Sequence, residues 1–252
     1  MIEVSELNVY YNGAQILRDV SAAFPLGKIT VVLGPNGSGK STLLKSLIRL
    51  NTEVSGRVML GGENVAAMSQ QALSRRVAYL PQARSIPDIT VGRLVMHGRF
   101  PYLSYPRRYR KEDHEKVRDA LCWMGLTDFA ERKMESLSGG QRQKVYLAMA
   151  LAQDTDVILM DEPTTFLDIR NQLEMLELIH RLSAEGKTVI MILHDFDLTL
   201  RYADNCLLMG EGRALCAGSA REVLSAPELA KVFGVTPHFY ETEDGLHCYV
   251  QK

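Results

Sequence analysis

The sequence predicts an α/β fold, because three short apolar segments have the character of buried strands and each is followed by polar residues. The β-branched run Ile29–Leu33 leads into a glycine-rich loop, and the four apolar residues Val157–Met160 lead into two acids. A third run, residues 187–193, precedes a histidine and an aspartate. Strands that are apolar throughout are typical of parallel sheets. Ligands bind beyond the carboxyl ends of such strands, so we expect the functional groups there.

Length and composition limit the classes of protein that this chain can represent. At 252 residues it is one large domain or two smaller lobes, and its 46% hydrophobic content is enough for a core. The net charge of −1 provides no overall basic field that would recruit nucleic acid. The four cysteines form no CxxC pair, which fits reduced thiols in a cytosolic protein.

No segment of the sequence predicts insertion into a membrane. The first residues lack the basic and apolar regions of a signal peptide. No window approaches the roughly 18 apolar residues that a membrane span requires. We therefore expect that any membrane role of this chain depends on a partner.

Residues 1–28 alternate apolar and polar side chains, which predicts a half-buried antiparallel sheet. Asn12 and Gly13 supply its first turn. Tyr11 lies just before that turn, at the edge of the sheet, where its ring is able to stack on a nucleotide base. An ordinary sheet tyrosine explains the same residue, so both interpretations stay open.

Residues 34–41 fit the pattern G-x-x-x-x-G-K-[ST] of phosphate-binding loops, with a strand before them and a helix after them as the motif requires. Glycines let the backbone approach a ligand, so that N–H groups form a concavity for anions, and the helix adds the positive end of its dipole. Lys40 is expected to bind the β- and γ-phosphates, and Ser41 to hold Mg²⁺. The expected nucleotide contacts are Gly34, Pro35, Asn36, Gly37, Ser38, Gly39, Lys40, Ser41 and Thr42.

Residues 54–80 return to short strands, with a helix near residues 69–76 and a last strand over Val77–Leu80. Pro81 ends this strand and Gln82 follows it. In that place Gln82 is able to present its amide to a metal ion or a water molecule. Taken alone, it is more simply a surface glutamine.

Residues 83–136 change character and predict an inserted helical lobe with an irregular, exposed first part. Prolines and aromatic residues there stand beside arginines and lysines, and residues 112–124 have the spacing of a helix. Basic and aromatic residues together are typical of nucleic-acid binding and of protein docking surfaces. A solvated loop has the same composition. The composition of this stretch therefore does not distinguish nucleic-acid binding, protein docking and a solvated loop.

The pentapeptide Leu-Ser-Gly-Gly-Gln at residues 137–141 precedes a largely apolar helix. Ser138 and Gln141 have the spacing of a capping box, which satisfies the first N–H groups of a helix. Small residues at a helix N-terminus also make a site for an anion. The pentapeptide by itself does not exclude a plain capped helix.

Two acids, Asp161 and Glu162, stand at the carboxyl end of the predicted strand Val157–Met160. Asp161 fits the acid that supports Mg²⁺ in phosphate-loop enzymes. Glu162 is one residue further, where it can orient or deprotonate a water molecule. The helix predicted next, over residues 169–182, is expected to face inward with Ile169, Leu173, Leu176, Ile179 and Leu182.

His194 follows the strand predicted over residues 187–193, on the same sheet edge as Asp161 and Glu162 if the strands are parallel neighbours. From there it is able to donate a hydrogen bond to a γ-phosphate and to hold the attacking water. The other histidines have no such placement.

The end of the chain predicts small elements without a functional assignment. Residues 206–218 predict a hairpin, and residues 236–252 predict a last one. Ser219 and Ser225 each precede a glutamate by three residues, which predicts two capping boxes on short helices.

Taken together and in this order, these motifs resemble the ATP-binding-cassette (ABC) ATPases over about residues 2–235. Many enzymes share the phosphate loop, but the Leu-Ser-Gly-Gly-Gln motif ahead of the acidic pair is found almost only in this family. The resemblance implies a single cassette with a RecA-like core, an antiparallel β subdomain and an inserted α-helical subdomain. Core and β subdomain are expected over residues 1–82 and 157–235, the helical subdomain over about 83–156, and a C-terminal hairpin over 236–252.

The resemblance also implies how the residues work. Such ATPases form head-to-tail dimers that hold two ATP molecules between residues 34–41 of one copy and Ser138, Gly139, Gly140 and Gln141 of the other. It implies that Tyr11 stacks on the base, Gln82 links Mg²⁺ to a membrane partner, Glu162 is the catalytic base, His194 is the switch histidine, and Asp168 belongs to the loop that contacts the opposite subunit.

Residues 98–102 (Gly-Arg-Phe-Pro-Tyr), 148–153 and 161–168 resemble the ATPases of importers for iron–siderophore complexes, haem and vitamin B12. This implies a membrane permease as partner, a substrate-binding protein reached indirectly, a place on the cytoplasmic side of the cell membrane, and no role for nucleic acid. The alternative is a soluble ABC ATPase without transport, of the repair, translation or Fe–S assembly type. A single cassette counts against the translation type, and the absence of a heptad insertion counts against the repair type.

Overall fold

The computed structural model describes residues 1–82, 86–243 and 245–251, and the chain folds as two compact units. The first unit combines Met1–Met68 with Leu182–Lys252, and the second is the continuous segment Ser69–Arg181. The helical subdomain expected over residues 83–156 therefore falls within the second unit, and its first residues, 83–85, lie outside the described part of the chain.

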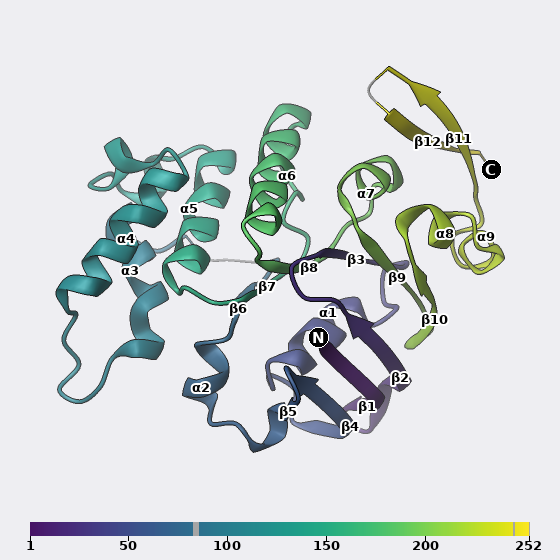
Figure 1. The fold of residues 1–252 in the computed structure, drawn as a ribbon, viewed down its shortest axis with the longest axis horizontal. Helices are drawn as coiled ribbons and strands as arrows, with labels where there is room; N and C mark the ends of the chain where they lie inside the picture. The colour runs from purple at the N-terminus through teal and green to yellow at the C-terminus, as the bar shows by residue number, and fades with distance from the viewer. Residues whose placement is uncertain (83–85, 244, 252) are drawn as a thin grey trace. The chain divides into compact units, whose positions relative to one another are not determined.

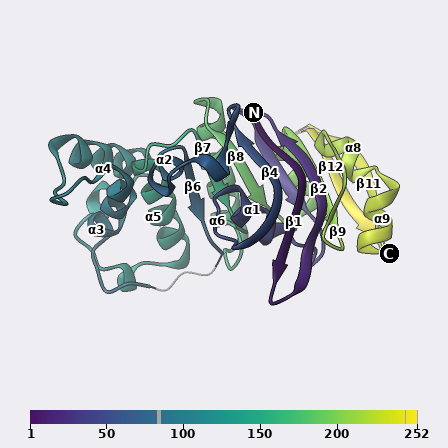
Figure 2. The ribbon, with the colours of Figure 1, turned by 90° about the horizontal axis from the view of Figure 1, so that it is seen from below.

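The N-terminal residues form an antiparallel sheet in the order β2-β1-β4-β5, which confirms the predicted antiparallel pairing (Figures 1 and 2). Ile2, Val4, Leu7 and Val9 are buried, and the break in their spacing of two falls on a register shift between Val4 and Leu7. Glu6 has a positive φ of 50° there, as in a β-bulge. The strands are β1 (Ile2–Tyr11), β2 (Ala14–Phe24), β4 (Glu53–Leu60) and β5 (Glu63–Asn64).

The other sheet of the first unit places β3 (Ile29–Leu33) between β8 (Thr188–Ile192) and β9 (Asn205–Gly210), parallel to both. Every residue of β3 and β8 is buried, as their apolar sequences predict. β10 (Arg213–Gly218) pairs antiparallel with β9, so the hairpin predicted over residues 206–218 is confirmed. The carboxyl ends of β3 and β8 share one edge of this sheet.

Four short helices connect the strands of the first unit: α1 (Lys40–Leu47), α7 (Phe196–Tyr202), α8 (Ala220–Leu224) and α9 (Pro227–Phe233). Ser219 forms the predicted capping box at the start of α8. The box predicted at Ser225 is wrong, because Ser225 ends α8 with helical dihedral angles and an N-cap needs an extended backbone. Ala226 is extended instead, and Pro227 begins α9.

The last strands, β11 (Thr236–Thr242) and β12 (Gly245–Gln251), pair as an antiparallel hairpin. Asp197 of α7 holds this hairpin, because one of its carboxylate oxygens accepts the Cys248 N–H over 2.9 Å. Burial raises the pKa of the Cys248 thiol to about 11 and that of Cys206 to about 12. These thiols stay protonated at neutral pH, and all four cysteines are free of disulfides.

In the second unit, β6 (Val77–Leu80) and β7 (Val157–Met160) pair in parallel with their carboxyl ends level, Leu80 opposite Met160. Both strands have the predicted bounds. Each is an apolar run that meets a residue unsuited to a buried strand, Pro81 in one case and Asp161 in the other. The polar residues that follow the two strands therefore lie at the same edge.

Helices fill the sequence between these two strands. α4 (Lys111–Trp123) packs with α3 (Val91–Met96) and α5 (Gly139–Ala152), as Figures 1 and 2 show. Val117 and Leu121 of α4, and Met124 at its end, are buried as predicted. The 3₁₀ helix η2 (His97–Tyr102) packs against α3 and α5 and against the short helix α2 (Gln70–Ser74).

Helix α6 (Ile169–Ala184) confirms the predicted helix but only part of its predicted inward face. Leu176, Ile179 and Leu182 are buried and Leu173 is half-buried, whereas Ile169 is 77% exposed. Ile169 is the first residue of the helix and directly follows an exposed loop. The buried residues of the helix lie in its later turns. At 16 residues α6 is the longest helix in the described part of the chain, where no helix is long and apolar enough to cross a membrane.

Candidate functional site

The loop between β3 and α1 has the backbone geometry of a cradle for anions. Gly34, Gly37 and Gly39 have positive φ angles of 152°, 81° and 96°. Other residues adopt such angles only with strain. Helix α1 begins at Lys40, and its N-cap Gly39 has no side chain to cap it. The start of the helix is therefore directed into the loop, where its N–H groups favour a negatively charged ligand.

Two buried polar side chains of this loop fit a phosphate ligand. Ser38 Oγ has no hydrogen-bond partner among the residues that the structure describes. Lys40 is 6% exposed, and its Nζ donates to the backbone oxygens of Gly34 over 2.7 Å and of Pro35 over 2.8 Å. Neither carbonyl carries a full negative charge, so a phosphate is a stronger partner for this ammonium. The cradle therefore fits the phosphate chain of a nucleotide.

Replacing Gly34 by alanine is expected to destabilise the protein more than replacing Gly37 by alanine. A Cβ on Gly34 lies 2.4 Å from Met209 O and 2.6 Å from Ser38 Oγ, whereas a Cβ on Gly37 meets nothing within 4 Å. Both variants carry the strain of a positive φ, about 1–2 kcal/mol. Gly34→Ala adds overpacking of about 1–3 kcal/mol. Urea unfolding measures the difference, and equal losses in the two variants would contradict the crowding of Gly34 against β9.

Tyr11 is tied to helix α1 through Asn51. The Tyr11 hydroxyl donates to Asn51 Oδ1, and Asn51 Nδ2 donates to Thr42 O over 2.9 Å and to Ser46 Oγ over 2.6 Å. The Tyr11 residue is 40% exposed, which leaves its ring accessible to a base. Stacking there stays a prediction. No pattern in the sequence marks Asn51, because its partners lie on another strand and on the preceding helix.

His194 lies beyond the carboxyl end of β8 and is exposed. Because β8 runs parallel to β3, with Ile192 opposite Val32, His194 and the phosphate loop follow strands that end at the same sheet edge. Asp195 fixes the chain here, since its Oδ1 accepts the Leu198 N–H over 2.8 Å and caps α7. The imidazole is therefore presented from a held segment on the edge where ligands bind.

Asp161 follows β7 and is 4% exposed. Its backbone N–H donates to Leu80 O over 2.8 Å, which continues the pairing of β6 with β7 by one residue. Tyr79 Oη donates to Asp161 Oδ2 over 3.2 Å. A buried, oriented carboxylate at a strand end is suited to supporting Mg²⁺ through oxygen. Tyr79, whose position inside a strand predicts only packing, is an added support for this acid.

Glu162 is held by two donors on one carboxylate oxygen. Gln82 Nε2 donates to Glu162 Oε2 over 2.6 Å, and Thr165 Oγ1 donates to it over 2.9 Å. Gln82 and Glu162 meet across 80 residues of sequence because β6 and β7 end level. Glu162 also has a positive φ of 52°, a strained angle of the kind that collects at functional sites. The amide nitrogen of Gln82 is engaged by Glu162, and its oxygen is the atom suited to a metal ion.

The capping box predicted at Ser138 is confirmed. Ser138 Oγ accepts the Gln141 N–H over 3.3 Å, and Gln141 Oε1 accepts the Ser138 N–H over 3.0 Å. Ser138 and Gly139 are exposed at the N-terminus of the 14-residue helix α5. Gly140 is buried, and a Cβ there would lie 2.4 Å from Asn171 Oδ1. The pentapeptide therefore presents its first residues outward and packs its last glycine inward.

Asp168 precedes α6 and is held by Asn171. Its Oδ1 accepts the Asn171 N–H over 2.8 Å, and its Oδ2 accepts from Asn171 Nδ2 over 2.7 Å. These hydrogen bonds lower the pKa of the Asp168 carboxyl, so it is ionised at neutral pH. Because Asn171 also lies against Gly140, it joins the Asp168 loop to the start of α5. The signal for Asn171 in the sequence is its place three residues after an acid at a helix start.

The predicted site residues thus fall into two sets, one in each unit. The first unit holds the phosphate loop, Tyr11 and His194, and the second holds Gln82, the 138–141 pentapeptide, and the acids Asp161, Glu162 and Asp168. In each set the functional groups stand at the ends of strands or at the starts of helices. The first set is suited to binding phosphate, and the second supplies carboxylates and a second helix N-terminus.

Other proteins are similar to this chain in sequence. A family model described as ABC transporter matches residues 17–165, more than half of the chain. The petrobactin import ATP-binding protein FpuD of Bacillus anthracis is 41% identical over 234 residues, which cover 92% of this chain and 86% of FpuD. The iron(3+)-hydroxamate import ATP-binding protein FhuC of Bacillus subtilis is 40% identical over 236 residues, which cover 93% of this chain and 88% of FhuC.

A solved structure shows that the likeness includes the fold. The ATP-binding cassette MJ0796, in a dimeric post-hydrolysis state bound to ADP and Pi, matches with a TM-score of 0.75 and 25% identity. The match covers 88% of this chain and 99% of that one, which confirms the expected RecA-like cassette fold. The chain therefore belongs to the ABC transporter family and is one of its ATP-hydrolysing ATP-binding cassettes.

Proposed function

We propose that this chain energises an importer of iron–siderophore, haem or cobalamin-type substrates by hydrolysing ATP on the cytoplasmic side of a membrane permease. The observation that carries the proposal is the extent of its likeness to petrobactin and iron(3+)-hydroxamate import proteins, about 40% identity over more than nine tenths of the chain. The Gly98–Tyr102 stretch of the importer branch supports it. The non-transport alternative is not favoured, because it explains neither observation.

Binding of ATP is assigned to the first set of residues. Lys40 binds the β- and γ-phosphates, the N–H groups of residues 34–42 surround them, and the exposed ring of Tyr11 stacks on the base. Ser41, Gln82 and Asp161 offer hydroxyl, amide and carboxylate oxygens, the donor types that Mg²⁺ takes in proteins. These oxygens would hold Mg²⁺, which would supply positive charge to offset that of the phosphates.

Hydrolysis is assigned to Glu162 and His194. Glu162, oriented by Gln82 and Thr165, accepts a proton from the attacking water. His194 donates a hydrogen bond to the γ-phosphate and helps to hold that water. Lys40 remains on the phosphates and offsets the charge that develops as the bond to the leaving oxygen breaks.

The site is proposed to be completed by a second copy of the chain, since ABC ATPases work as dimers. Ser138, Gly139, Gly140 and Gln141 of one copy bind the γ-phosphate of the other, and Asp168 contacts the opposite subunit. Two observations support this arrangement. Ser138 and Gly139 are exposed at the start of α5, and Phe166, two residues before Asp168, is 95% exposed. Ile169, three residues after Phe166, is 77% exposed, and exposed apolar side chains that occur together mark protein contacts.

The permease is proposed to dock on the helices of the second unit. A groove of about 500 Å³ there is lined by residues of α3 and α4 that include Arg93, Met96 and His114. An aromatic ladder runs beside it, in which His97 stacks on Phe100 at 4.6 Å between ring centroids and Phe100 on Tyr109 at 6.4 Å. Phe100 is 52% exposed. Aromatic and arginine side chains together are enriched where proteins bind one another.

Replacing Phe100 by aspartate is expected to lower recovery of the permease about tenfold or more, because an exposed aromatic anchor is replaced by a charge. The measurement is copurification from detergent of the tagged ATPase with the membrane protein encoded beside it. Tyr240→Asp is the control, since Tyr240 is similarly exposed, 47%, but lies on the C-terminal hairpin. Equal recovery with both variants would place the dock elsewhere, and no recovery with the unaltered chain would favour the non-transport class.

A further inference from the structure

Arg99 in η2 is a buried arginine to which the proposed reaction gives no role. The residue is 2% exposed, and its partner Asp113 near the start of α4 is 4% exposed. Arginine is almost never fully buried unless it is paired. A buried ion pair is also a poor device for stability alone, because the cost of removing two charges from water offsets their attraction. The contacts of Arg99 therefore indicate a positional role.

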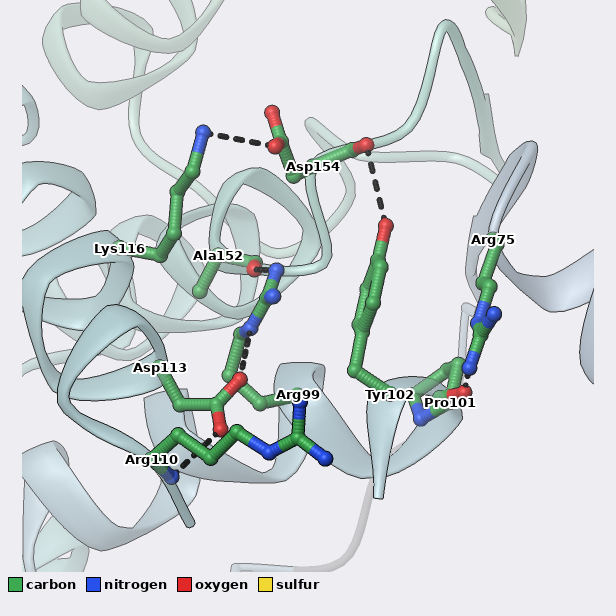
Figure 3. A network of polar contacts seen from close by, with 9 residues as sticks. All are labelled: Arg75, Arg99, Pro101, Tyr102, Arg110, Asp113, Lys116, Ala152 and Asp154. Carbon is green, nitrogen blue, oxygen red and sulfur yellow. Dashed lines mark hydrogen bonds and ion pairs between the residues drawn. The ribbon is translucent and has the colours of Figure 1, made fainter. Parts of the chain in front are cut away.

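Arg99 joins two helices (Figure 3). Its Nε donates to Asp113 Oδ1 over 2.9 Å, and its Nη1 donates to Ala152 O, on the last residue of α5, over 2.8 Å. The guanidinium lies 3.8 Å from the centre of the Tyr102 ring. Asp113 Oδ2 accepts the Arg110 N–H over 2.8 Å, so the same carboxylate also caps α4.

Asp113 is ionised, so the contact with Arg99 is a true ion pair. Burial raises the pKa of the Asp113 carboxyl, but the hydrogen bonds from the Arg110 N–H and from Arg99, with the charges of both arginines, outweigh it. The net pKa is below the ordinary value for aspartate. The planar guanidinium therefore has one fixed geometry, with its fork divided between a carboxylate and a helix carbonyl.

The neighbours of Arg99 attach η2 to the same end of α5. A Cβ on Gly98 would lie 2.2 Å from Met149 O and 3.1 Å from Gln153 N, so the two backbones touch. Tyr102 Oη donates to Asp154 O, just beyond α5, over 3.4 Å. Pro101 O accepts from Arg75 Nε over 2.9 Å (Figure 3). Gly98, Arg99 and Tyr102 thus meet the last turn of α5 or the chain just beyond it.

We propose that Arg99 is a positioning residue for Ser138, because it fixes the carboxyl end of the helix whose other end carries that serine. The carbonyls of a last helical turn lack partners within the helix, and Arg99 supplies one of them with a charged donor. The 14 residues of α5 span about 20 Å and transmit a displacement along the helix axis. η2 also carries Phe100 of the proposed dock, so the link joins dock and γ-phosphate site. The inference rests on the role proposed for Ser138.

The test compares two double variants of the full chain. Arg99→Met/Asp113→Asn removes both buried charges together, and the asparagine oxygen still accepts the Arg110 N–H, so neither an unpaired charge nor a lost cap unfolds the protein. Lys111→Met/Glu115→Gln removes an exposed ion pair of the same helix, with the two side chains 92% and 43% exposed, and serves as the matched control. Steady-state ATP hydrolysis is measured for both, with thermal unfolding alongside.

The buried double variant is expected to lose about tenfold or more in kcat with the KM for ATP unchanged, because a small displacement of Ser138 affects the closed site and not the phosphate loop. The control keeps both constants. Arg99→Lys keeps the ion pair but not the fork, so it should unfold at the wild-type temperature and still show a lower kcat.

Two results would overturn the inference. One is a kcat of the buried double variant equal to that of the control. The other is a loss of kcat that comes with a raised KM and a lower unfolding temperature, which is the mark of a merely structural pair. Failure of the role proposed for Ser138 has a separate readout, a wild-type kcat of Ser138→Arg, a variant that leaves the contacts of Arg99 unchanged.

Discussion

Glu162→Gln is expected to bind ATP and to hydrolyse it at least about a hundredfold more slowly than the wild type, the range that a general base contributes. Glu162 accepts hydrogen bonds from Gln82 and Thr165 on a single oxygen. A glutamine oxygen accepts the same two bonds, so the local geometry is kept. The amide cannot take a proton from the attacking water, so only the chemical step is affected.

The measurement pairs a phosphate-release assay with the affinity for ATP determined by calorimetry. Glu177→Gln is the control, because Glu177 is an exposed glutamate of α6 that belongs to neither set of site residues. A Glu162→Gln protein that released phosphate at the wild-type rate would remove Glu162 from the role of base. An equal loss in the control would trace the effect to a change of net charge.

Lys40→Ala is expected to weaken ATP binding by about 10- to 100-fold, because a hydrogen bond to a charged group contributes about 1.5–3 kcal/mol. The stability of the protein without nucleotide should change little. Lys40 is buried, so its replacement removes the cost of burying an ammonium together with its hydrogen bonds, two of which go to carbonyl oxygens. The loss of affinity is therefore specific to the phosphates.

Titration with ATP and urea unfolding of the same preparations test this separation. Lys45→Ala is the matched control, since Lys45 carries the same charge in the last turn of the same helix. If the affinity of Lys40→Ala fell only in step with its unfolding free energy, the loop would be a structural element and not a phosphate site. Equal weakening in both variants would point to the general charge of α1.

Elements with a local cause were predictable. The strands Val77–Leu80 and Val157–Met160 have the predicted bounds, because each is a short apolar run that stops at a proline or an acid. The capping box of Ser138 and Gln141 is confirmed, because its two hydrogen bonds join residues three apart. The phosphate loop was predictable for the same reason, since its backbone angles depend on glycines within a few residues.

Two predictions failed because the pattern of one segment was not weighed against the elements and loops beside it. Ser225 and Glu228 have the spacing of a cap, yet Ser225 is used to end α8, and Pro227 begins the next helix. Ile169 matches the apolar spacing of α6, yet it lies in the first turn, directly after an exposed loop, and is 77% exposed. A sequence pattern predicts which face of a helix is buried, but it does not predict how many turns of that face other elements cover.

By itself the sequence determined the chemistry available to this protein: a phosphate loop with Lys40 and Ser41, acids at a strand end, and a second helix start at Ser138. These depend on residue types at short spacings, which act on the backbone beside them. Only the tertiary structure decided that Gln82 holds Glu162 and that Arg99 joins Asp113 to the end of α5. Such contacts join residues 14 to 80 positions apart in the chain. The packing of whole strands and helices brings them together, and no local preference encodes it.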